Sequence, residues 1–172
     1  MRLDDDDFSL FGLPQRQAQD RAEIEARWKA LAAKVHPDKF ATEGAAAQRQ
    51  SMQWALRVNE AHQRLRDPLK RAAYLCELRG APLHVEDNTR MPTQFLMEQM
   101  AWREALDDAA DATAVQALDD EVAAREQALM AETARLLDQA DDARAAAEQV
   151  RALMFVARFR ADIDKRLDAL GQ

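Results

Sequence analysis

The most distinctive group of polar side chains in this sequence is a His-Pro-Asp tripeptide at residues 36–38, which has no catalytic partner nearby. Pro37 lacks an N–H and disfavours the helical conformation of the residue before it. A helix that precedes the tripeptide should therefore end at His36 and leave these side chains in an exposed turn. The sequence thus predicts hydrogen-bonding chemistry at a surface rather than inside a cleft.

The other residues that could do chemistry give an enzyme or a metal site little support. The remaining histidines are His62 and His84, and no histidine belongs to a Glu-x-x-His pair of the di-iron type. Together with Cys76, the histidines lack the clustered spacing of zinc ligands. His62 and Cys76 fall at apolar positions of helical patterns, where they fit a core. A P-loop is also absent. We therefore expect no enzyme activity, no metal and no cofactor.

Two amphipathic helical patterns flank the tripeptide, and each repeats its apolar positions every three or four residues. Their lengths predict an antiparallel hairpin with the tripeptide at its tip. The apolar positions are Ile24, Trp28, Leu31 and Val35 in the first helix, and Met52, Ala55, Val58, His62 and Leu65 in the second.

A short helix is predicted after the hairpin, from about Leu69 to Arg79. Asp67 supplies an N-cap acceptor, Pro68 is a preferred first helical residue, and Gly80 can end the helix. Further glycine, proline and polar residues then interrupt the helical pattern as far as Pro92. We place a domain boundary in this segment, with a first domain at residues 1–79, a linker at 80–92 and a second domain at 93–172.

The second domain is predicted to be a three-helix bundle, which makes the whole chain all-α. The expected helices are Thr93 to Ala109, Ala114 to Gln139 and Ala143 to Leu170. The first of them has two apolar faces. One carries Phe95, Gln99, Trp102 and Leu106, and the other carries Leu96, Met97, Met100, Glu104 and Asp108.

The second face of this helix is open to two interpretations. Both faces could be core, as happens when a helix lies between two neighbours. However, an apolar patch with the acidic border of Glu104 and Asp108 is better suited to binding than to burial. Phe155 lies off the apolar seam of the last helix, so it could be displayed beside this patch.

Charge is divided between the two domains. Residues 1–79 carry 14 Lys and Arg against 12 Asp and Glu, whereas residues 80–172 carry 10 against 19. This asymmetry suggests two protein surfaces with different partners. Nucleic acid is not expected as a partner, because the chain is acidic overall and its basic residues lack interleaved aromatics. We expect the run Asp4 to Asp7 to be a solvated tail.

The sequence also gives expectations about location. Met1-Arg2-Leu3 followed by four aspartates is unlike a targeting leader, and a single cysteine cannot form an internal disulfide. No apolar run approaches the roughly 20 residues that span a bilayer. We expect a cytoplasmic protein that does not enter a membrane.

The surroundings of the tripeptide carry a family resemblance. Alone, His-Pro-Asp could be a helix stop followed by a capping aspartate. In this sequence it follows Phe11-Gly12-Leu13-Pro14 and precedes Val58-Asn59-Glu60-Ala61 and Leu65-Arg66-Asp67-Pro68, and this order resembles a J-domain. Arg71-Ala72-Ala73-Tyr74-Leu75 and Phe95-Leu96-Met97-Glu98-Gln99 extend the likeness over nearly the whole chain to HscB, a family of iron–sulfur-cluster co-chaperones.

The resemblance implies two protein partners. The J-domain would stimulate the ATPase of HscA, a DnaK-type chaperone, and the second domain would deliver the iron–sulfur scaffold IscU to it. The implied chaperone-binding residues are His36, Pro37, Asp38, Arg27, Lys29, Lys34 and Lys39. The implied scaffold-binding residues are Leu96, Met97, Met100, Arg103, Glu104, Asp108 and Phe155. Ala101 departs from the family pattern, which has an acidic residue there. A J-domain co-chaperone for a different client is the alternative.

Overall fold

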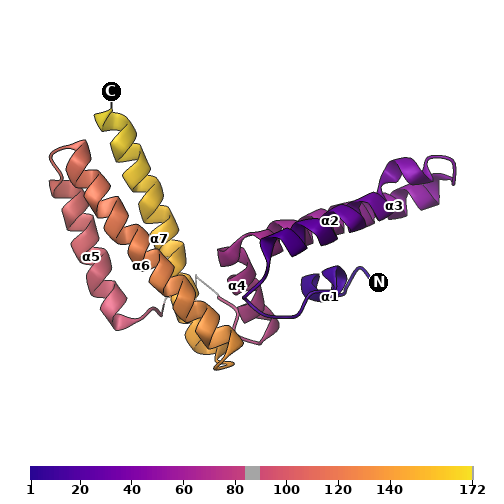
Figure 1. Cartoon of the computed structure of the whole chain (residues 1–172), viewed down its shortest axis with the longest axis horizontal. Helices are drawn as coiled ribbons and strands as arrows, with labels where there is room; N and C mark the ends of the chain where they lie inside the picture. Colours follow the sequence, from indigo (N-terminus) through magenta and orange to yellow (C-terminus); the bar gives the residue numbers. More distant parts are fainter. Residues whose placement is uncertain (84–89, 172) are drawn as a thin grey trace. The chain divides into compact units, whose positions relative to one another are not determined.

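The computed structural model of this chain describes residues 1–83 and 90–171, and this part of the chain is helical without strands. Figure 1 shows the elements in chain order. They are α1 (Asp7–Phe11), α2 (Arg21–Val35), the 3-10 turn η1 (Pro37–Phe40), α3 (Ala45–Arg66), α4 (Pro68–Leu78), α5 (Thr93–Asp108), α6 (Ala112–Asp138) and α7 (Ala143–Leu170). The predicted all-α class is confirmed, and the four helices for which bounds were predicted, α4 to α7, begin and end within two residues of those bounds.

The chain forms two compact units, Met1–Leu75 and Cys76–Gln172, so the division falls within α4. The linker expected at 80–92 is described only in part, because residues 84–89 lie outside the described residues. None of the described helices is both long enough and apolar enough to cross a membrane.

The first unit is built on the hairpin of α2 and α3, which lie side by side in Figure 1. Asp20 caps α2 by accepting a hydrogen bond from the Ala22 N–H at 2.9 Å. Ile24 and Val35 of α2 are buried with Val58 and Leu65 of α3. Met52, which the predicted apolar pattern of α3 included, is exposed, and the neighbouring Ser51 is buried instead.

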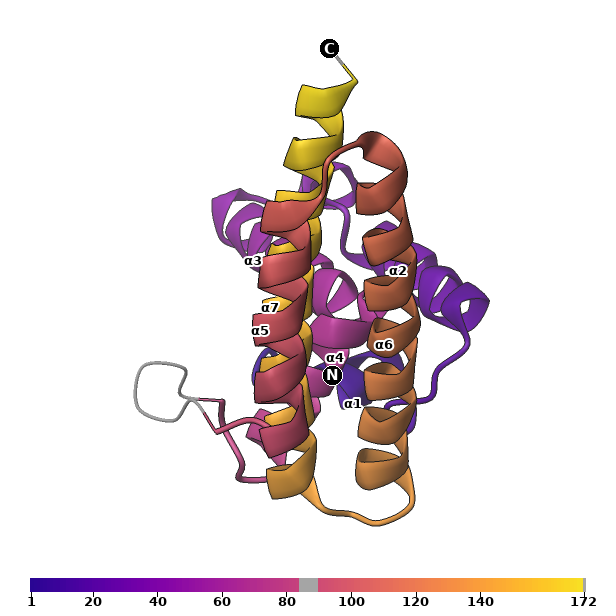
Figure 2. The same ribbon diagram turned by 90° about the vertical axis from the view of Figure 1, so that its left-hand side faces the viewer.

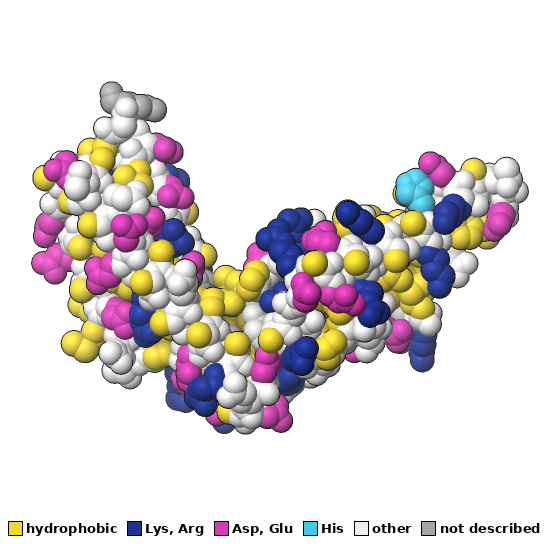
Figure 3. Space-filling model, in the orientation of Figure 1, with side chains coloured by type: hydrophobic (Ala, Val, Ile, Leu, Met, Phe, Trp, Pro, Cys, Tyr) yellow, Lys and Arg dark blue, Asp and Glu magenta, His cyan; other side chains and the backbone are white. Residues whose placement is uncertain are grey.

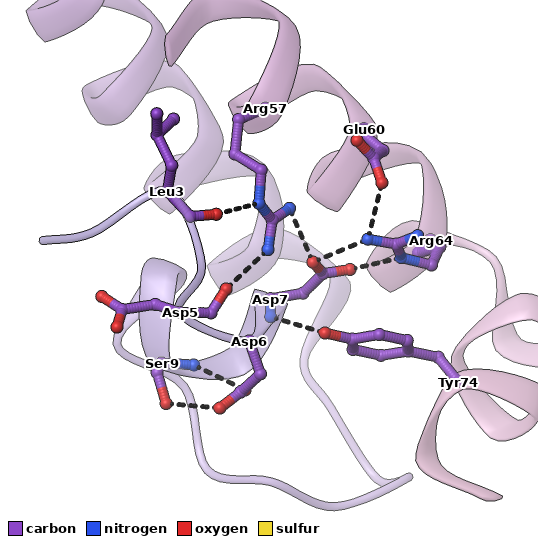
Figure 4. Close-up of polar contacts among 9 residues, drawn as sticks. All are labelled: Leu3, Asp5, Asp6, Asp7, Ser9, Arg57, Glu60, Arg64 and Tyr74. Carbon is purple, nitrogen blue, oxygen red and sulfur yellow. Dashed lines mark hydrogen bonds and ion pairs between the residues drawn. The ribbon is translucent and has the colours of Figure 1, made fainter. Parts of the chain in front are cut away.

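The acidic run at the N-terminus is not a solvated tail throughout, so that prediction was wrong. Asp4 is exposed, but Asp7 is 0% exposed and begins α1. Figure 4 shows two arginines of α3 on its carboxylate: Arg57 Nη1 lies 2.8 Å from Oδ1, and Arg64 Nε lies 2.7 Å from Oδ2. The Asp7 N–H donates to the Tyr74 hydroxyl of α4 at 3.0 Å. Asp7 therefore joins α1 to α3 and α4.

We expect Asp7→Asn to lower the free energy of unfolding of the first unit by about 3 kcal/mol, because removing one partner of a buried ion pair leaves the others unpaired. Chemical denaturation followed by circular dichroism measures this change. Asp4→Asn is the matched control, since Asp4 is exposed and its one partner among the described residues is Arg2, on the surface. Equal stability of both variants would contradict the structural role of Asp7.

The second unit contains α5, α6 and α7, which run alongside one another in Figures 1 and 2. Asp111 and Asp142 cap α6 and α7 by accepting hydrogen bonds from backbone N–H groups. Apolar residues at helical spacing in α6 and α7 form the buried seams of these helices, namely Val115, Leu118, Val122, Leu129, Leu136, Leu153, Val156, Phe159 and Ile163. At the end of α7, Leu167 is half-buried and Leu170 is exposed, so the buried seam of α7 ends at Ile163.

Two arginines tie the segment after α4 to this unit. Gly80 has a φ of 80°, and the Ala81 N–H donates to the Cys76 carbonyl at 2.8 Å, so Gly80 ends α4 as predicted. Arg79 donates to the Leu137 carbonyl at the end of α6. The buried Arg151 of α7 donates to two carbonyls, those of Leu83 at 3.2 Å and Arg90 at 3.0 Å.

Candidate protein-binding surfaces

The tripeptide occupies the turn between α2 and α3, as the proline spacing predicted. His36 has φ −59° and ψ 130°, an extended conformation that ends α2, and Pro37 begins η1. His36 Nδ1 accepts a hydrogen bond from the Asp38 N–H at 3.2 Å. In this arrangement Nε2 carries the ring proton of the neutral imidazole. The two side chains are 57% and 92% exposed, so Nε2–H and the Asp38 carboxylate can face a partner.

The basic residues beside the tripeptide fall into two groups. Lys29, Lys34 and Lys39 are exposed, and none forms an ion pair with another described residue. Arg27 is engaged within the unit, because its Nε pairs with Glu23 at 2.9 Å and its Nη1 donates to the Phe11 carbonyl at 3.3 Å. Arg27, which is predicted to contact the chaperone, thus also holds α2 against the end of α1.

A stacked pair of rings holds α2 against α3. Trp28 and His62 lie nearly parallel, with ring centroids 4.1 Å apart. The Trp28 indole N–H donates to Asn59 Oδ1 at 3.0 Å, and His62 Nε2 lies 2.9 Å from Glu25 Oε1. The hydrogen bond with His62 lowers the pKa of the Glu25 carboxyl. His62 is therefore a satisfied core histidine, as its helical position predicted.

A second exposed surface lies on α5. Phe95, Trp102 and Leu106 are buried, whereas Leu96, Met97 and Met100 are 43%, 72% and 75% exposed. We call these three residues the α5 apolar face. Beside it is an open groove of about 490 Å³, and its lining residues are Gln99, Met100, Arg103, Glu104, Asp107, Asp108 and Phe155. Apolar and acidic side chains thus meet on one surface of the second unit.

Phe155 joins this groove to the core of the unit. Its ring stacks on Phe159 at 5.9 Å between centroids and meets the edge of Phe95 at 5.7 Å. The Arg103 guanidinium lies 4.9 Å above the Phe159 ring, and its Nη2 pairs with Asp162 at 3.2 Å. Phe155 is half-buried, so it contributes both to the groove and to the packing of α5 on α7.

Two residues of the groove were missed by sequence reasoning. Gln99 was assigned to the buried seam of α5, but it is only half-buried and its Oε1 has no hydrogen-bond partner among the described residues. Gln99 lies about 40° from Phe95 around the helix axis, and this angle could have been used to predict that it lies at the edge of the buried seam. Asp107 follows the acidic border by one residue. Ala101 is exposed and does not line the groove.

The surface charges follow the division expected from the sequence. In Figure 3, Lys and Arg side chains are frequent over the α2–α3 hairpin, whereas Asp and Glu side chains prevail over the α5–α7 unit. The two candidate surfaces thus differ in charge as well as in shape, so they suit different partners.

In the described part of the chain, no three His, Cys, Asp or Glu side chains are grouped so that they could hold a metal ion. His84, one of the three histidines, lies outside the described residues. Cys76 is buried, and its burial raises the pKa of its thiol to about 11. A thiol with this pKa is a poor nucleophile and a poor metal ligand.

Comparison with known families defines the class of protein. Residues 8–74 match the DnaJ domain family, and this match covers the hairpin, the tripeptide and most of α4. Residues 91–164 match the family described as the HSCB C-terminal oligomerisation domain. A chain with these two parts is a J-domain co-chaperone.

Comparison with whole proteins narrows the class to one family. Over 171 residues the chain is 48% identical to the "Co-chaperone protein HscB homolog" of Burkholderia mallei, covering 98% of this chain and 97% of the relative. The homolog of Bordetella avium is 48% identical over 160 residues, which are 92% of this chain and 95% of the relative. This chain belongs to the HscB family of co-chaperones.

Solved structures show the same architecture. Chaperone HscB from Vibrio cholerae has a TM-score of 0.81 at 35% identity, and the match covers 96% of this chain and 99% of that one. The human co-chaperone HscB has a TM-score of 0.85 at 25% identity, with 96% and 84% covered. The predicted fold of a J-domain followed by a helical C-terminal domain is therefore confirmed.

Proposed function

We propose that this chain stimulates the ATPase of a DnaK-type chaperone of the HscA type and delivers an IscU-type iron–sulfur scaffold to it in the cytoplasm. The proposal assigns the chaperone contact to residues 1–79, the connection to 80–92 and the scaffold contact to 93–172. One observation carries it: a member of the HscB family displays an exposed His-Pro-Asp turn on one unit and an exposed apolar face with an acidic border on the other.

On the chaperone side, the proposed residues act in two ways. His36 Nε2–H and the Asp38 carboxylate form hydrogen bonds with the ATPase domain, while Pro37 fixes the turn that presents them. Lys29, Lys34, Lys39 and the outer edge of Arg27 act through charge complementarity, which mainly sets the encounter rate and the register of the complex. The chain itself needs no catalytic group, because the chaperone hydrolyses the ATP.

On the scaffold side, the α5 apolar face supplies the anchors. Exposed methionines and leucine lose water-accessible apolar area when a partner covers them, and methionine adapts to an irregular surface. Glu104 and Asp108 border the groove and favour a partner with basic side chains, and Arg103 adds one positive charge. Phe155 lines the groove where α5 and α7 pack together. The scaffold carries the iron–sulfur cluster as cargo.

Delivery follows from having both surfaces in one chain. When one partner is bound, the other is held at an effective concentration set by the connection between the units, so the two binding events support each other. The expected sign of this effect is synergy. Chain and scaffold together should stimulate ATP hydrolysis by the chaperone more than the sum of their separate effects.

Steady-state ATP hydrolysis by a purified HscA-type chaperone tests this proposal, with the chain and the scaffold added separately and together. A mixture of two full-length variants, one altered only in the turn and the other only in the α5 apolar face, should not restore synergy at sub-saturating concentration. Restored synergy would show that delivery does not depend on tethering. If the unaltered chain does not change the rate of ATP hydrolysis by the chaperone, the proposal that the chaperone is its partner is wrong.

A J-protein for a different client is the alternative. The acidic border of the groove favours the scaffold only if the scaffold presents basic residues. A pull-down with the full chain, comparing the IscU-type scaffold with unrelated unfolded proteins, separates the two. Retention of the scaffold alone supports delivery, and equal retention of unfolded proteins supports the alternative.

A further inference from the structure

A second groove lies at the tip of the α2–α3 hairpin, beside the His-Pro-Asp turn. It is an open groove of about 260 Å³ between the end of α2, η1 and the start of α3, and we call it the tip groove. Its lining residues are Val35, Phe40, Glu43, Ala47, Gln50, Ser51 and Trp54. Three of them are large apolar side chains, and none of the predicted partner contacts uses them.

The walls of the tip groove continue the turn in the chain. Val35 directly precedes His36, and Phe40 comes two residues after Asp38. A partner that covers the tripeptide must therefore also lie beside Val35 and Phe40, the residues that form these walls. This continuity points to the partner of the turn as the occupant of the groove.

Trp54 has the properties of a contact residue. Its side chain is half-buried in the groove, and its indole N–H has no hydrogen-bond partner among the described residues. The indole of Trp28, by contrast, donates to Asn59 Oδ1. A tryptophan with one apolar face and a free donor is the type of side chain that anchors protein interfaces.

We infer that the tip groove receives an apolar side chain of the DnaK-type chaperone and that Trp54 sets part of the affinity for it. The inference rests on the proposed function, because it assigns the groove to the chaperone that the turn contacts. A second copy of the chain fits less well. The groove adjoins the turn that is proposed to contact the chaperone, whereas no observation links the turn to a second copy of the chain.

Two substitutions test the groove. Trp54→Ala removes the anchor, and Ala47→Glu fills the groove from the first turn of α3, where an acidic side chain suits the helix dipole and the fold is preserved. Each should raise the concentration for half-maximal ATPase stimulation about tenfold while the maximal rate is kept, because a lost anchor of this kind weakens binding by at least this factor. Ala46→Glu is the matched control, since Ala46 is exposed in the same turn and does not line the groove.

The outcomes separate this inference from the proposed function. Wild-type half-maximal concentrations for both Trp54→Ala and Ala47→Glu, with His36→Gln inactive in the same assay, would overturn the inference alone. Full stimulation by His36→Gln would overturn both. A tenfold rise for Ala47→Glu but not for Ala46→Glu, with unchanged thermal unfolding of both proteins, would support the groove contact.

Discussion

Replacing His36 by Gln, or Asp38 by Asn, is expected to abolish stimulation of the chaperone ATPase, whatever concentration of the chain is used. The substitutions remove the ring N–H of the turn or the charge of its carboxylate, which are the groups that we propose to bond to the ATPase domain. Both side chains are largely exposed and lie outside the core, so the fold should be unaffected. Steady-state ATP hydrolysis measures the effect.

Thr42→Ala is the matched control for these variants, because Thr42 is exposed in the same loop and carries no proposed contact. All three proteins should keep the helical circular dichroism and the scaffold affinity of the unaltered chain. Stimulation by His36→Gln at the unaltered level would remove the ground for assigning the turn to the chaperone.

Replacing Leu96, Met97 and Met100 together by alanine is expected to weaken scaffold binding at least a hundredfold. Apolar anchors at the centre of an interface commonly cost more than about 1 kcal/mol each on truncation, and about 1.4 kcal/mol is a tenfold change in affinity. Stability should change little, because these side chains are exposed in the free chain. Titration calorimetry with the purified scaffold measures the affinity.

Leu170→Ala controls for the loss of exposed apolar area elsewhere on the second unit, at the end of α7. Phe155 is best tested separately as Phe155→Leu, because its half-buried ring packs on Phe95 and Phe159 and truncation to alanine would also disturb the core. Scaffold affinity unchanged in the triple variant would mean that the α5 apolar face serves another partner.

The helices and the turn could be predicted from local signals. Pro37 ended α2, Asp67 and Pro68 began α4, and Gly80 ended it, since each effect depends on one or two backbone positions. The environment of Asp7 depends on contacts with residues 50 to 67 positions away in the chain. Arg57 and Arg64 stand seven residues apart on one face of α3, which is a possible signal, but nothing local connects them to an acidic run.

Residues at the edges of the helix faces were the other part of the structure that could not be predicted from the sequence. Gln99 and Met52 each fit an apolar pattern by spacing, yet the structure places one at the border of a groove and the other at the surface. Periodicity gives the direction of a face to within part of a turn, whereas burial depends on how close the neighbouring helix comes. The buried centre of α5 was therefore predictable, and the residues along its margin were not.

The two carbonyl contacts of Arg151 have a consequence for how the sequence can vary. One guanidinium holds the backbone at Leu83 and at Arg90, so the chain enters and leaves the intervening stretch at fixed points on α7. A substitution of Arg151 would thus release the backbone at both points together, so this position of α7 should tolerate fewer replacements than Arg158, which is exposed on the same helix.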